Sequence, residues 1–317
     1  MDITFGPVPS RRLGRSLGVN NIPPKVCSYA CVYCQLGRAI RMQRTRALFY
    51  QPEEIERAVE EQLERSDREN GEIDYLCFVP DGEPTLDLHL GESIRRLKKF
   101  GIPIALISNG SLMEDAWLRE ELLQLDWISL KLDAADENVW RRIDRPFKEI
   151  DFGGMLTGYR RFARQFSGTL TTETMLIRDI NTGEAELEAL AEVLDPMEPD
   201  ISYIAVPTRP PAERWAEPAV EESVAQAYRV FSRTLPVVEL LIGYEGNAFS
   251  HSGDARRDLL SITAVHPMRQ EAVDELLNRD NADRSVLEEL ISDGSLLKTQ
   301  FHGQVYYVRK FREKQMG

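Results

Sequence analysis

This 317-residue chain has few of the residues that bind metals or cross-link proteins: only four cysteines and four histidines. The histidines are scattered without the spacing of a zinc site. No apolar run approaches the roughly 20 residues that a membrane span requires, and residues 1–20 lack the apolar core of a secretory signal. We therefore expect a protein of the reducing cytoplasm, without a membrane segment and without disulfides.

Positive charge is also in short supply, with 39 Lys and Arg against 52 Asp and Glu and a net charge of −13. Because duplex affinity comes chiefly from neutralised phosphates, this balance argues against a generic nucleic-acid binder, although a local basic groove stays open. Hydrophobic content of 42% and charged content of 29% are ordinary for a globular protein. The length suits one large domain plus a small one, or two of middling size.

Three of the four cysteines, Cys27, Cys31 and Cys34, lie within eight residues of one another. They are one ligand short of a closed tetrahedral zinc site, and the fourth cysteine, Cys77, lies inside the apolar run Tyr75–Val79. Cysteine thiolates are the usual ligands of iron–sulfur clusters, and three of them leave one iron of a cubane without a protein ligand. The sequence favours such an open cluster over the alternatives of zinc or a disulfide, and Cys77 is most simply a packed core thiol.

The CxxxCxxC spacing, with Tyr33 directly before the last cysteine, resembles the signature of the radical S-adenosylmethionine (radical SAM) superfamily. This resemblance implies a [4Fe–4S] cluster whose open iron chelates the amino and carboxylate groups of SAM. It also implies an oxidoreductase-type reaction, in which one electron from the cluster cleaves SAM to a 5'-deoxyadenosyl radical that abstracts hydrogen from a substrate. A one-electron donor of the flavodoxin or ferredoxin type is the implied partner.

Strands alternate with helices over the first three quarters of the chain, which predicts an α/β fold with parallel pairing and right-handed crossovers. The resemblance implies a partial (β/α)6 barrel of the TIM type, open on one side, and function in such barrels gathers at the C-terminal strand ends. The expected strands cover residues 16–22, 73–79, 103–108, 127–132, 168–177 and 201–206, and the expected helices cover 52–68, 88–100, 114–123, two short segments within 136–164, 184–194 and 220–233.

The second expected strand is followed directly by Asp81, Gly82, Glu83 and Pro84. This run resembles the superfamily's GGEP motif, which implies that it binds the SAM amino group, with Tyr33 close to the cofactor. A glycine allows close backbone approach, and a carboxylate accepts hydrogen bonds from an ammonium group. Asp81 replaces the first glycine of the usual motif. The alternative reading is an ordinary Asp-Gly turn.

Polar residues also end the third and fourth expected strands. The resemblance implies that Ser108 and Asn109 contact the methionyl or ribose part of SAM, and a plain strand-terminating turn is the alternative. Ser129, Lys131 and Asp133 share one face of their strand. Three polar groups inside a barrel need partners, so Lys131 is a candidate for the SAM carboxylate and Ser129 or Asp133 for the ribose. A mutual Lys131–Asp133 ion pair is the alternative.

Several charged residues have no settled role at this stage. Glu173 on the fifth expected strand either contacts a ligand inside the barrel or is an outward charge. Arg209, in a Pro-rich loop after the sixth strand, is either presented to an anionic substrate or part of a surface turn. Arg11, Arg12 and Arg15 precede the first expected strand, either at the open mouth or in a solvated basic stretch.

The character of the sequence changes after residue 236, which predicts three parts: a barrel over 1–236, a linker over 237–254 and a C-terminal domain over 255–317. Residues 237–243 form an optional extra strand. The last part shows three helices and a hairpin, an order typical of a winged helix, and its ten Lys and Arg balance its ten Asp and Glu. Winged helices are relatives of DNA readers. An alternative function is therefore an iron–sulfur redox sensor or regulator that binds DNA.

The segment Phe5–Arg12, taken with the cysteine loop, resembles the branch around the wyosine-base tRNA synthases, whose members carry a second cluster. Only Cys77 is left over here, so a second cluster held entirely by cysteines is excluded. The leading hypothesis is a radical SAM enzyme with one cluster and an unassigned substrate. A macromolecular substrate, either RNA or a peptide, is one prediction.

Overall fold

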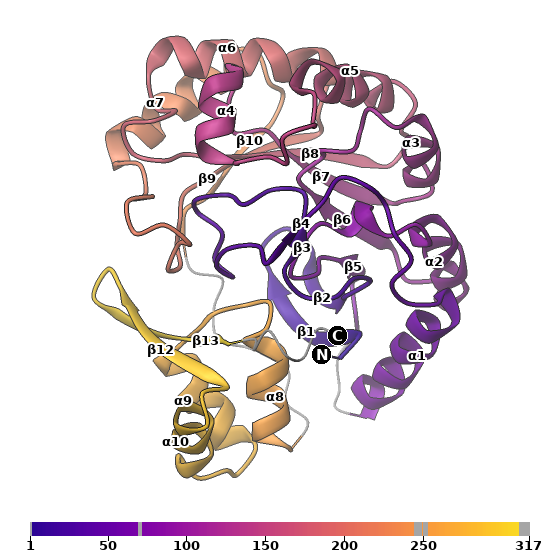
Figure 1. Cartoon of the computed structure of the whole chain (residues 1–317), viewed down its shortest axis with the longest axis vertical. Helices are drawn as coiled ribbons and strands as arrows, with labels where there is room; N and C mark the ends of the chain where they lie inside the picture. The colour runs from indigo at the N-terminus through magenta and orange to yellow at the C-terminus, as the bar shows by residue number, and fades with distance from the viewer. Residues whose placement is uncertain (1, 69–71, 244–248, 250–252, 311–317) are drawn as a thin grey trace.

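An eight-stranded sheet curves around the centre of the molecule in the computed structural model, which describes residues 2–68, 72–243, 249 and 253–310 (Figure 1). Its spatial order is β1-β2-β5-β6-β7-β8-β9-β10. All neighbouring strands are parallel except β1 and β2. The strands are β1 (Thr4–Ser10), β2 (Gly14–Val19), β5 (Tyr75–Phe78), β6 (Ile104–Ser108), β7 (Trp127–Lys131), β8 (Thr169–Met175), β9 (Ile201–Ala205) and β10 (Val238–Leu241).

Helices line the outer face of this sheet, as Figure 1 shows. In α1 (Pro52–Arg68), Ile55 and Val59 recur four residues apart and are fully buried, so one stripe of the helix packs on the sheet. The outer helices are α1, α2 (Leu90–Leu97), α3 (Ala116–Leu122), α4 (Glu137–Ile143), α5 (Phe152–Ala163), α6 (Glu184–Leu194) and α7 (Glu221–Phe231). The six expected strand–helix repeats are therefore present. None of the helices in the described residues is long and apolar enough to cross a membrane.

Strand β1 was not expected from the sequence, because Gly6, Pro7 and Pro9 interrupt its pattern. It lies at the edge of the sheet, where a proline is tolerated since its missing N–H breaks no ladder. The expectation that the N-terminal arginines precede the first strand is wrong: Arg11 and Arg12 lie in the turn between β1 and β2, and Arg15 lies within β2.

The expected extra strand after residue 236 is present as β10, which pairs in parallel with β9. Part of the range assigned to a linker therefore belongs to the sheet, while residues 244–248 and 250–252 of that range lie outside the described part. The three domain boundaries stay predictions.

Residues 253–310 form a second cluster of elements, here called the C-terminal module. A three-stranded sheet of order β11-β13-β12 packs with three helices, and residues Phe5 and Val8 of β1 belong to the same hydrophobic core. The expected order of three helices and a hairpin is observed, with one short additional strand; the winged-helix assignment itself stays a prediction. The elements are α8 (Ala255–Ile262), β11 (Met268–Arg269), α9 (Gln270–Arg279), α10 (Ser285–Ser292), β12 (Leu296–Phe301) and β13 (Gln304–Arg309).

Candidate functional site

A pocket of about 340 Å³ extends from the C-terminal ends of the parallel strands into the interior of the barrel. Its volume falls within the range of about 300–1,000 Å³ typical of small-molecule sites. Four parts of the chain form its wall: the cysteine loop, the ends of strands β5 to β9, the β1–β2 turn and the C-terminal module. Segments far apart in sequence therefore meet here, as expected for the functional end of such a barrel.

The cysteine loop brings Cys27, Cys31 and Cys34 to this pocket, and all three side chains are partly exposed there. The loop begins at the short strand β3 (Val26–Cys27), which pairs with β4 (Arg41–Met42), and the Cys34 amide donates to the Cys31 carbonyl at 3.1 Å. Burial raises the pKa of each thiol above its ordinary value. A positive iron centre would offset this burial cost, because metal binding favours the thiolate form.

Within the described residues, no three His, Cys, Asp or Glu side chains gather closely enough to bind a single metal ion. A single zinc ion draws its thiolates to about 2.3 Å. In a cubane each cysteine binds a different iron, so the three sulfurs stand further apart. The three free thiols lie on one loop and line one cavity, so they match the all-thiolate donor set of a [4Fe–4S] cluster.

The loop after β5 is attached directly to the cysteine loop. A Cβ atom on Gly82 would lie 2.0 Å from the Val26 carbonyl oxygen, so only glycine fits this approach. The Glu83 amide donates to the same carbonyl at 3.1 Å. This contact places Glu83 beside Cys27, the residue that follows Val26.

Glu83 is 1% exposed and accepts four hydrogen bonds from neutral donors. These include the Ser108 hydroxyl at 2.7 Å and the Asn109 amide at 2.8 Å, while the Asn109 side-chain Nδ2 lies 3.7 Å from the Cys27 sulfur. Burial raises the pKa of Glu83, although the hydrogen bonds from Thr85 and Ser108 oppose that shift. Asn109 thus connects the cysteine loop to the acidic motif.

Asp81, which replaces the usual first glycine of the motif, forms a buried ion pair with Lys25 at 3.1 Å. Burial raises the pKa of Asp81 to about 6, and Lys25 opposes the shift. Lys25 lies two residues before Cys27 and also donates to the Leu36 carbonyl, two residues after Cys34. The ion pair therefore holds both ends of the cysteine loop against the β5 loop.

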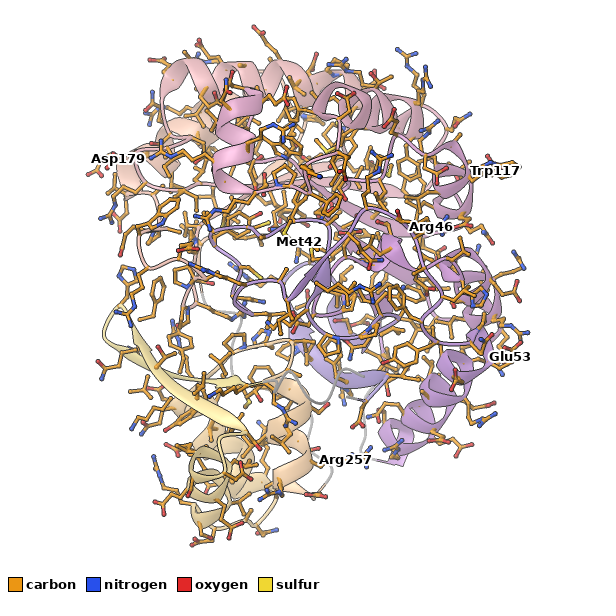
Figure 2. All side chains as sticks on the ribbon, in the orientation of Figure 1. Met42, Arg46, Glu53, Trp117, Asp179 and Arg257 are labelled. Atoms are coloured by element: carbon orange, nitrogen blue, oxygen red, sulfur yellow. The ribbon has the colours of Figure 1, made fainter. Side chains whose placement is uncertain are left out.

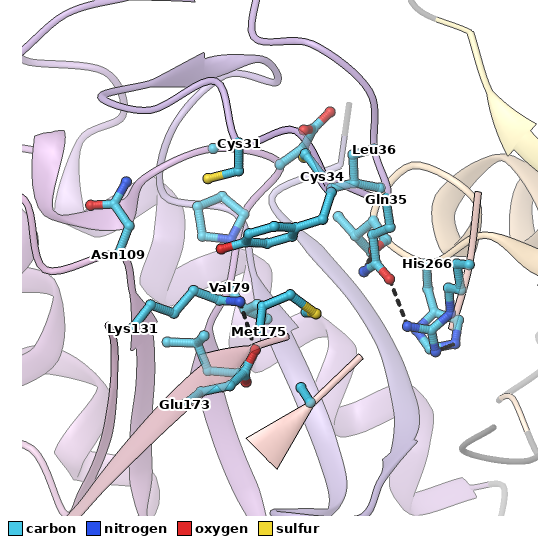
Figure 3. Close-up of a pocket in the computed structure, with 18 of the residues that line it drawn as sticks. Cys31, Cys34, Gln35, Leu36, Val79, Asn109, Lys131, Glu173, Met175 and His266 are labelled. Carbon is cyan, nitrogen blue, oxygen red and sulfur yellow. Dashed lines mark hydrogen bonds and ion pairs between the residues drawn. The ribbon is translucent and has the colours of Figure 1, made fainter. Parts of the chain in front are cut away.

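Three charged residues meet inside the barrel. Lys131 donates to Glu173 at 2.6 Å (Figure 3), and Arg12 binds the other oxygen of the same carboxylate. Glu173 therefore points into the barrel. Of the two orientations left open by the sequence, the inward one is observed. Lys131 also lies 5.0 Å from the centre of the Tyr33 ring, a cation–π contact. The expected alternative, a Lys131–Asp133 pair, is not the one that forms.

Asp133 lies behind Tyr33, whose hydroxyl donates to it, and its other oxygen accepts from the Met175 amide at 2.7 Å. Asp144 accepts from the Cys31 thiol at 3.3 Å. Burial, and then the neighbouring Asp133 carboxylate, raise the pKa of Asp144 well above its ordinary value. These two acids therefore lie beneath the cysteine loop and support it.

Most of the residues predicted to bind the cofactor line the pocket: Tyr33, Gly82, Glu83, Ser108, Asn109 and Lys131. Three others do not line it: Pro84, Ser129 and Asp133. Ser129 lies two residues below Lys131 on β7, deep enough that its hydroxyl is buried without a hydrogen-bond partner. Pro84 begins a buried 3₁₀ turn, and Asp133 is turned toward Tyr33 and Met175.

The pocket also contains residues that sequence reasoning did not assign. Arg209 is 8% exposed and reaches the wall, where it binds Gln35 and His266. Its burial shows that it is not part of a solvated surface turn, and presentation to an anionic substrate stays a prediction. No sequence signal marks Gln35 or His266. Both are defined by their contact with Arg209, and Gln35 lies 174 residues from Arg209 in the chain.

Comparison with known proteins gives concordant matches. A family model described as "Radical SAM superfamily" matches residues 21–193. A protein of Methanocaldococcus jannaschii, named UPF0026 protein MJ1312, is 41% identical over 316 residues, covering 99% of this chain and 98% of its own length. A UPF0026 protein of Helicobacter pylori is 36% identical over 195 residues, covering 61% of this chain and 62% of its own length.

Solved structures share the fold at low sequence identity. A radical SAM methyltransferase from Sphaerobacter thermophilus has a TM-score of 0.55 and 15% identity, covering 72% of this chain and 66% of its own. The Streptococcus suis protein SuiB, solved with the precursor peptide SuiA, has a TM-score of 0.52 and 11% identity, covering 70% of this chain and 48% of its own. These likenesses confirm the partial-barrel fold and carry nothing about substrate.

Proposed function

The chain belongs to the radical SAM superfamily, whose members use a [4Fe–4S] cluster and SAM, and from this premise we propose a one-cluster radical enzyme whose substrate is unassigned. Cys27, Cys31 and Cys34 hold three irons of the cluster. The observation that carries this assignment is the position of Asn109, which contacts both Cys27 and Glu83 and so joins the cluster loop to the proposed SAM site.

The chain's own side chains provide binding and orientation. Glu83 is the proposed acceptor for the SAM ammonium, and Lys131 is the proposed partner of its carboxylate. Tyr33, Gly82, Ser108 and Asn109 complete the wall that excludes water. When bound, the cluster would supply the electron that splits the carbon–sulfur bond of SAM, releasing methionine and a 5'-deoxyadenosyl radical for hydrogen abstraction.

Anaerobic loading of the full chain with iron and sulfide tests this proposal. We expect about four iron and four sulfide per chain, as one cubane requires, and formation of 5'-deoxyadenosine from SAM with dithionite. Cys31→Ala should lose both. Cys77→Ala is the control for the loss of a thiol at the pocket outside the cysteine loop, because Cys77 lines the pocket from β5 and packs with Ala105 and Trp127. A Cys31→Ala protein that still cleaves SAM contradicts the assignment.

The DNA-binding redox sensor gains no support. In a winged helix the third helix reads DNA, but the exposed side of α10 carries Glu288 and Glu289. Carboxylates there would repel phosphates. RNA or a peptide as substrate, the likeness to the wyosine-base tRNA synthases, the flavodoxin- or ferredoxin-type donor and the cytoplasmic location stay predictions. A salt-dependent gel shift with RNA supports the RNA version, and no binding at about 50 mM salt counts against it.

A further inference from the structure

The C-terminal module contacts the cysteine loop through a chain of three side chains, Gln35, Arg209 and His266. The Arg209 guanidinium donates to the Gln35 amide oxygen at 2.6 Å and lies 2.7 Å from Nε2 of His266. Gln35 also donates to the carbonyl of Val265 at 3.5 Å. Figure 3 shows Gln35 and His266 on the same side of the pocket, away from Lys131 and Glu173.

His266 accepts a hydrogen bond from Arg209 through its Nε2 atom. It is 8% exposed, and burial, with Arg209 second, holds its pKa well below the ordinary value. The ring is therefore neutral, and since Arg209 can only donate, Nε2 accepts and Nδ1 carries the proton. The ring also makes a buried edge-to-face contact with Phe249, at 5.0 Å between centroids.

The C-terminal module also holds the β9–α7 loop, which carries Arg209, at a second point. The Tyr306 hydroxyl donates to the Thr208 carbonyl at 2.9 Å, one residue before Arg209. Tyr306 is 1% exposed and accepts from Arg269 at 3.1 Å. Two buried side chains of the module therefore fix adjacent residues of the β9–α7 loop, so Arg209 has little freedom to move away from Gln35.

Gln35 matters because it follows Cys34 directly. The turn that contains both residues is closed by two backbone bonds, from Cys34 to Cys31 and from Gly37 to Cys34, each at 3.1 Å. Groups that orient metal ligands from behind typically change metal affinity or activity about 10–100-fold when they are removed. A contact that fixes Gln35 consequently acts on the third cysteine of the loop.

We propose that the C-terminal module is a built-in wall of the reaction pocket, and that His266 is a positioning residue that holds the Cys34 turn through Arg209 and Gln35. This inference rests on the proposed function, since the Cys34 turn is taken as part of the cluster site. It gives the module a role inside the enzyme itself. A role in recognising a distant macromolecule is not needed to explain these contacts.

The test uses the full chain with His266→Ala, His266→Gln and the control His302→Ala. His302 is half-exposed on the same module and lies 3.5 Å from Glu217 of the same loop. Its removal therefore tests the loss of a module histidine that does not contact Arg209. Glutamine places an oxygen acceptor near the position of Nε2 and should restore the contact.

Hydrogen–deuterium exchange of residues 31–40, measured before cluster loading, should be faster in His266→Ala and return toward wild type in His266→Gln. After loading, His266→Ala should bind SAM about tenfold more weakly and show a shifted electron paramagnetic resonance signal for the reduced cluster. His302→Ala should match wild type in each measurement. Unchanged exchange and an unchanged cluster signal in His266→Ala overturn the inference.

If His266→Ala does not fold, Gln35→Ala severs the same chain from its other end and decides the question by the same measurements. A wild-type protein that loads no cluster defeats the proposed function instead. The exchange experiment separates these two failures, because it judges the His266–Arg209–Gln35 contact without any cluster present.

Discussion

Two glutamates in this molecule each bind one lysine and one arginine, but one lies inside the barrel and the other on its outer surface. Glu173, inside the barrel, binds Lys131 and Arg12. Glu56, on the outer face of α1, binds Lys99 at 2.5 Å and Arg96 at 2.9 Å. The outer group extends through Arg96 to Glu53, which projects away from the molecule in Figure 2.

Burial separates the two groups. Side-chain exposure is 7% for Glu173 against 20% for Glu56, and 21% for Lys131 against 43% for Lys99. Burial alone would raise the pKa of Glu173, but Lys131 and then Arg12 lower it to about 2. Because a buried ion pair is often no more stable than a well-packed apolar substitute, its presence in the pocket points to a demand of function more than of stability.

Removing each carboxylate is the strongest way to break this comparison. We expect Glu173→Gln to lower the free energy of unfolding by about 3 kcal/mol, the lower end of the range for a buried pair, because Lys131 and Arg12 are only partly buried. Glu56→Gln, the matched variant on the outer face, should change it little, since exposed pairs contribute little. Urea unfolding of both variants measures the difference. Equal losses would mean that burial does not distinguish the two groups.

Lowering the pH should remove the contribution of Glu173 to the free energy of unfolding as its carboxylate is protonated. Its folded pKa of about 2 is below its ordinary value of 4.5. The stabilisation is therefore complete above pH of about 4.5 and is lost as the pH falls toward 2, amounting to about 3 kcal/mol. The gap in unfolding free energy between wild type and Glu173→Gln should shrink by roughly half or more from pH 6 to pH 3. A constant gap over that range contradicts the ion pairing.

Glu83 sharpens the comparison because it is as buried as Glu173 but bonded to neutral donors. Its negative charge is therefore available to the SAM ammonium under the proposed function. Glu83→Gln should weaken SAM binding about tenfold or more, because a charge-assisted hydrogen bond is lost. Calorimetry on anaerobically loaded protein measures this, with Glu56→Gln as control. Unchanged affinity would remove Glu83 from the proposed site.

Added salt should give the smallest effect on stability, and it should weaken the Glu56 ion pairs more than the Glu173 ion pairs. Mobile ions screen exposed pairs strongly and buried pairs weakly, with a Debye length of about 3 Å at 1 M salt. Any effect of Glu56→Gln on unfolding should disappear at 1 M NaCl, whereas that of Glu173→Gln should persist. Parallel unfolding curves at low and high salt check this, and persistence of both effects would argue against a solvent-screened outer group.

The sequence predicted the parts of the site that are contiguous in the chain. The cysteine loop and the polar strand ends each lie within a few residues. Cysteine spacing, the resemblance to the GGEP motif and strand alternation were therefore enough to predict Cys27, Glu83 and Lys131, which all line the pocket. Helix α1 was predicted with its observed ends because proline and a regular apolar stripe mark it. Strand β1 was missed because prolines at a sheet edge leave no regular pattern.

The remaining features depend on contacts that no local pattern encodes. The direction of Glu173 follows from the register between β7 and β8, which pairs it with Lys131. Whether Asp133 faces the cavity depends on Tyr33, a residue 100 positions away. The approach of His266 to Arg209 requires the C-terminal module to be in place. Tertiary structure decides each of these outcomes.

The shared core of β1 and the C-terminal module has a consequence for synthesis on the ribosome. Phe5 and Val8 are made first, yet the residues that cover them, such as Leu259, are made near the end. At about 5–20 residues per second, their covering arrives roughly 10–50 s later. A nascent chain therefore presents an uncovered apolar strand edge through most of translation, which makes it a natural client for chaperones at the exit tunnel.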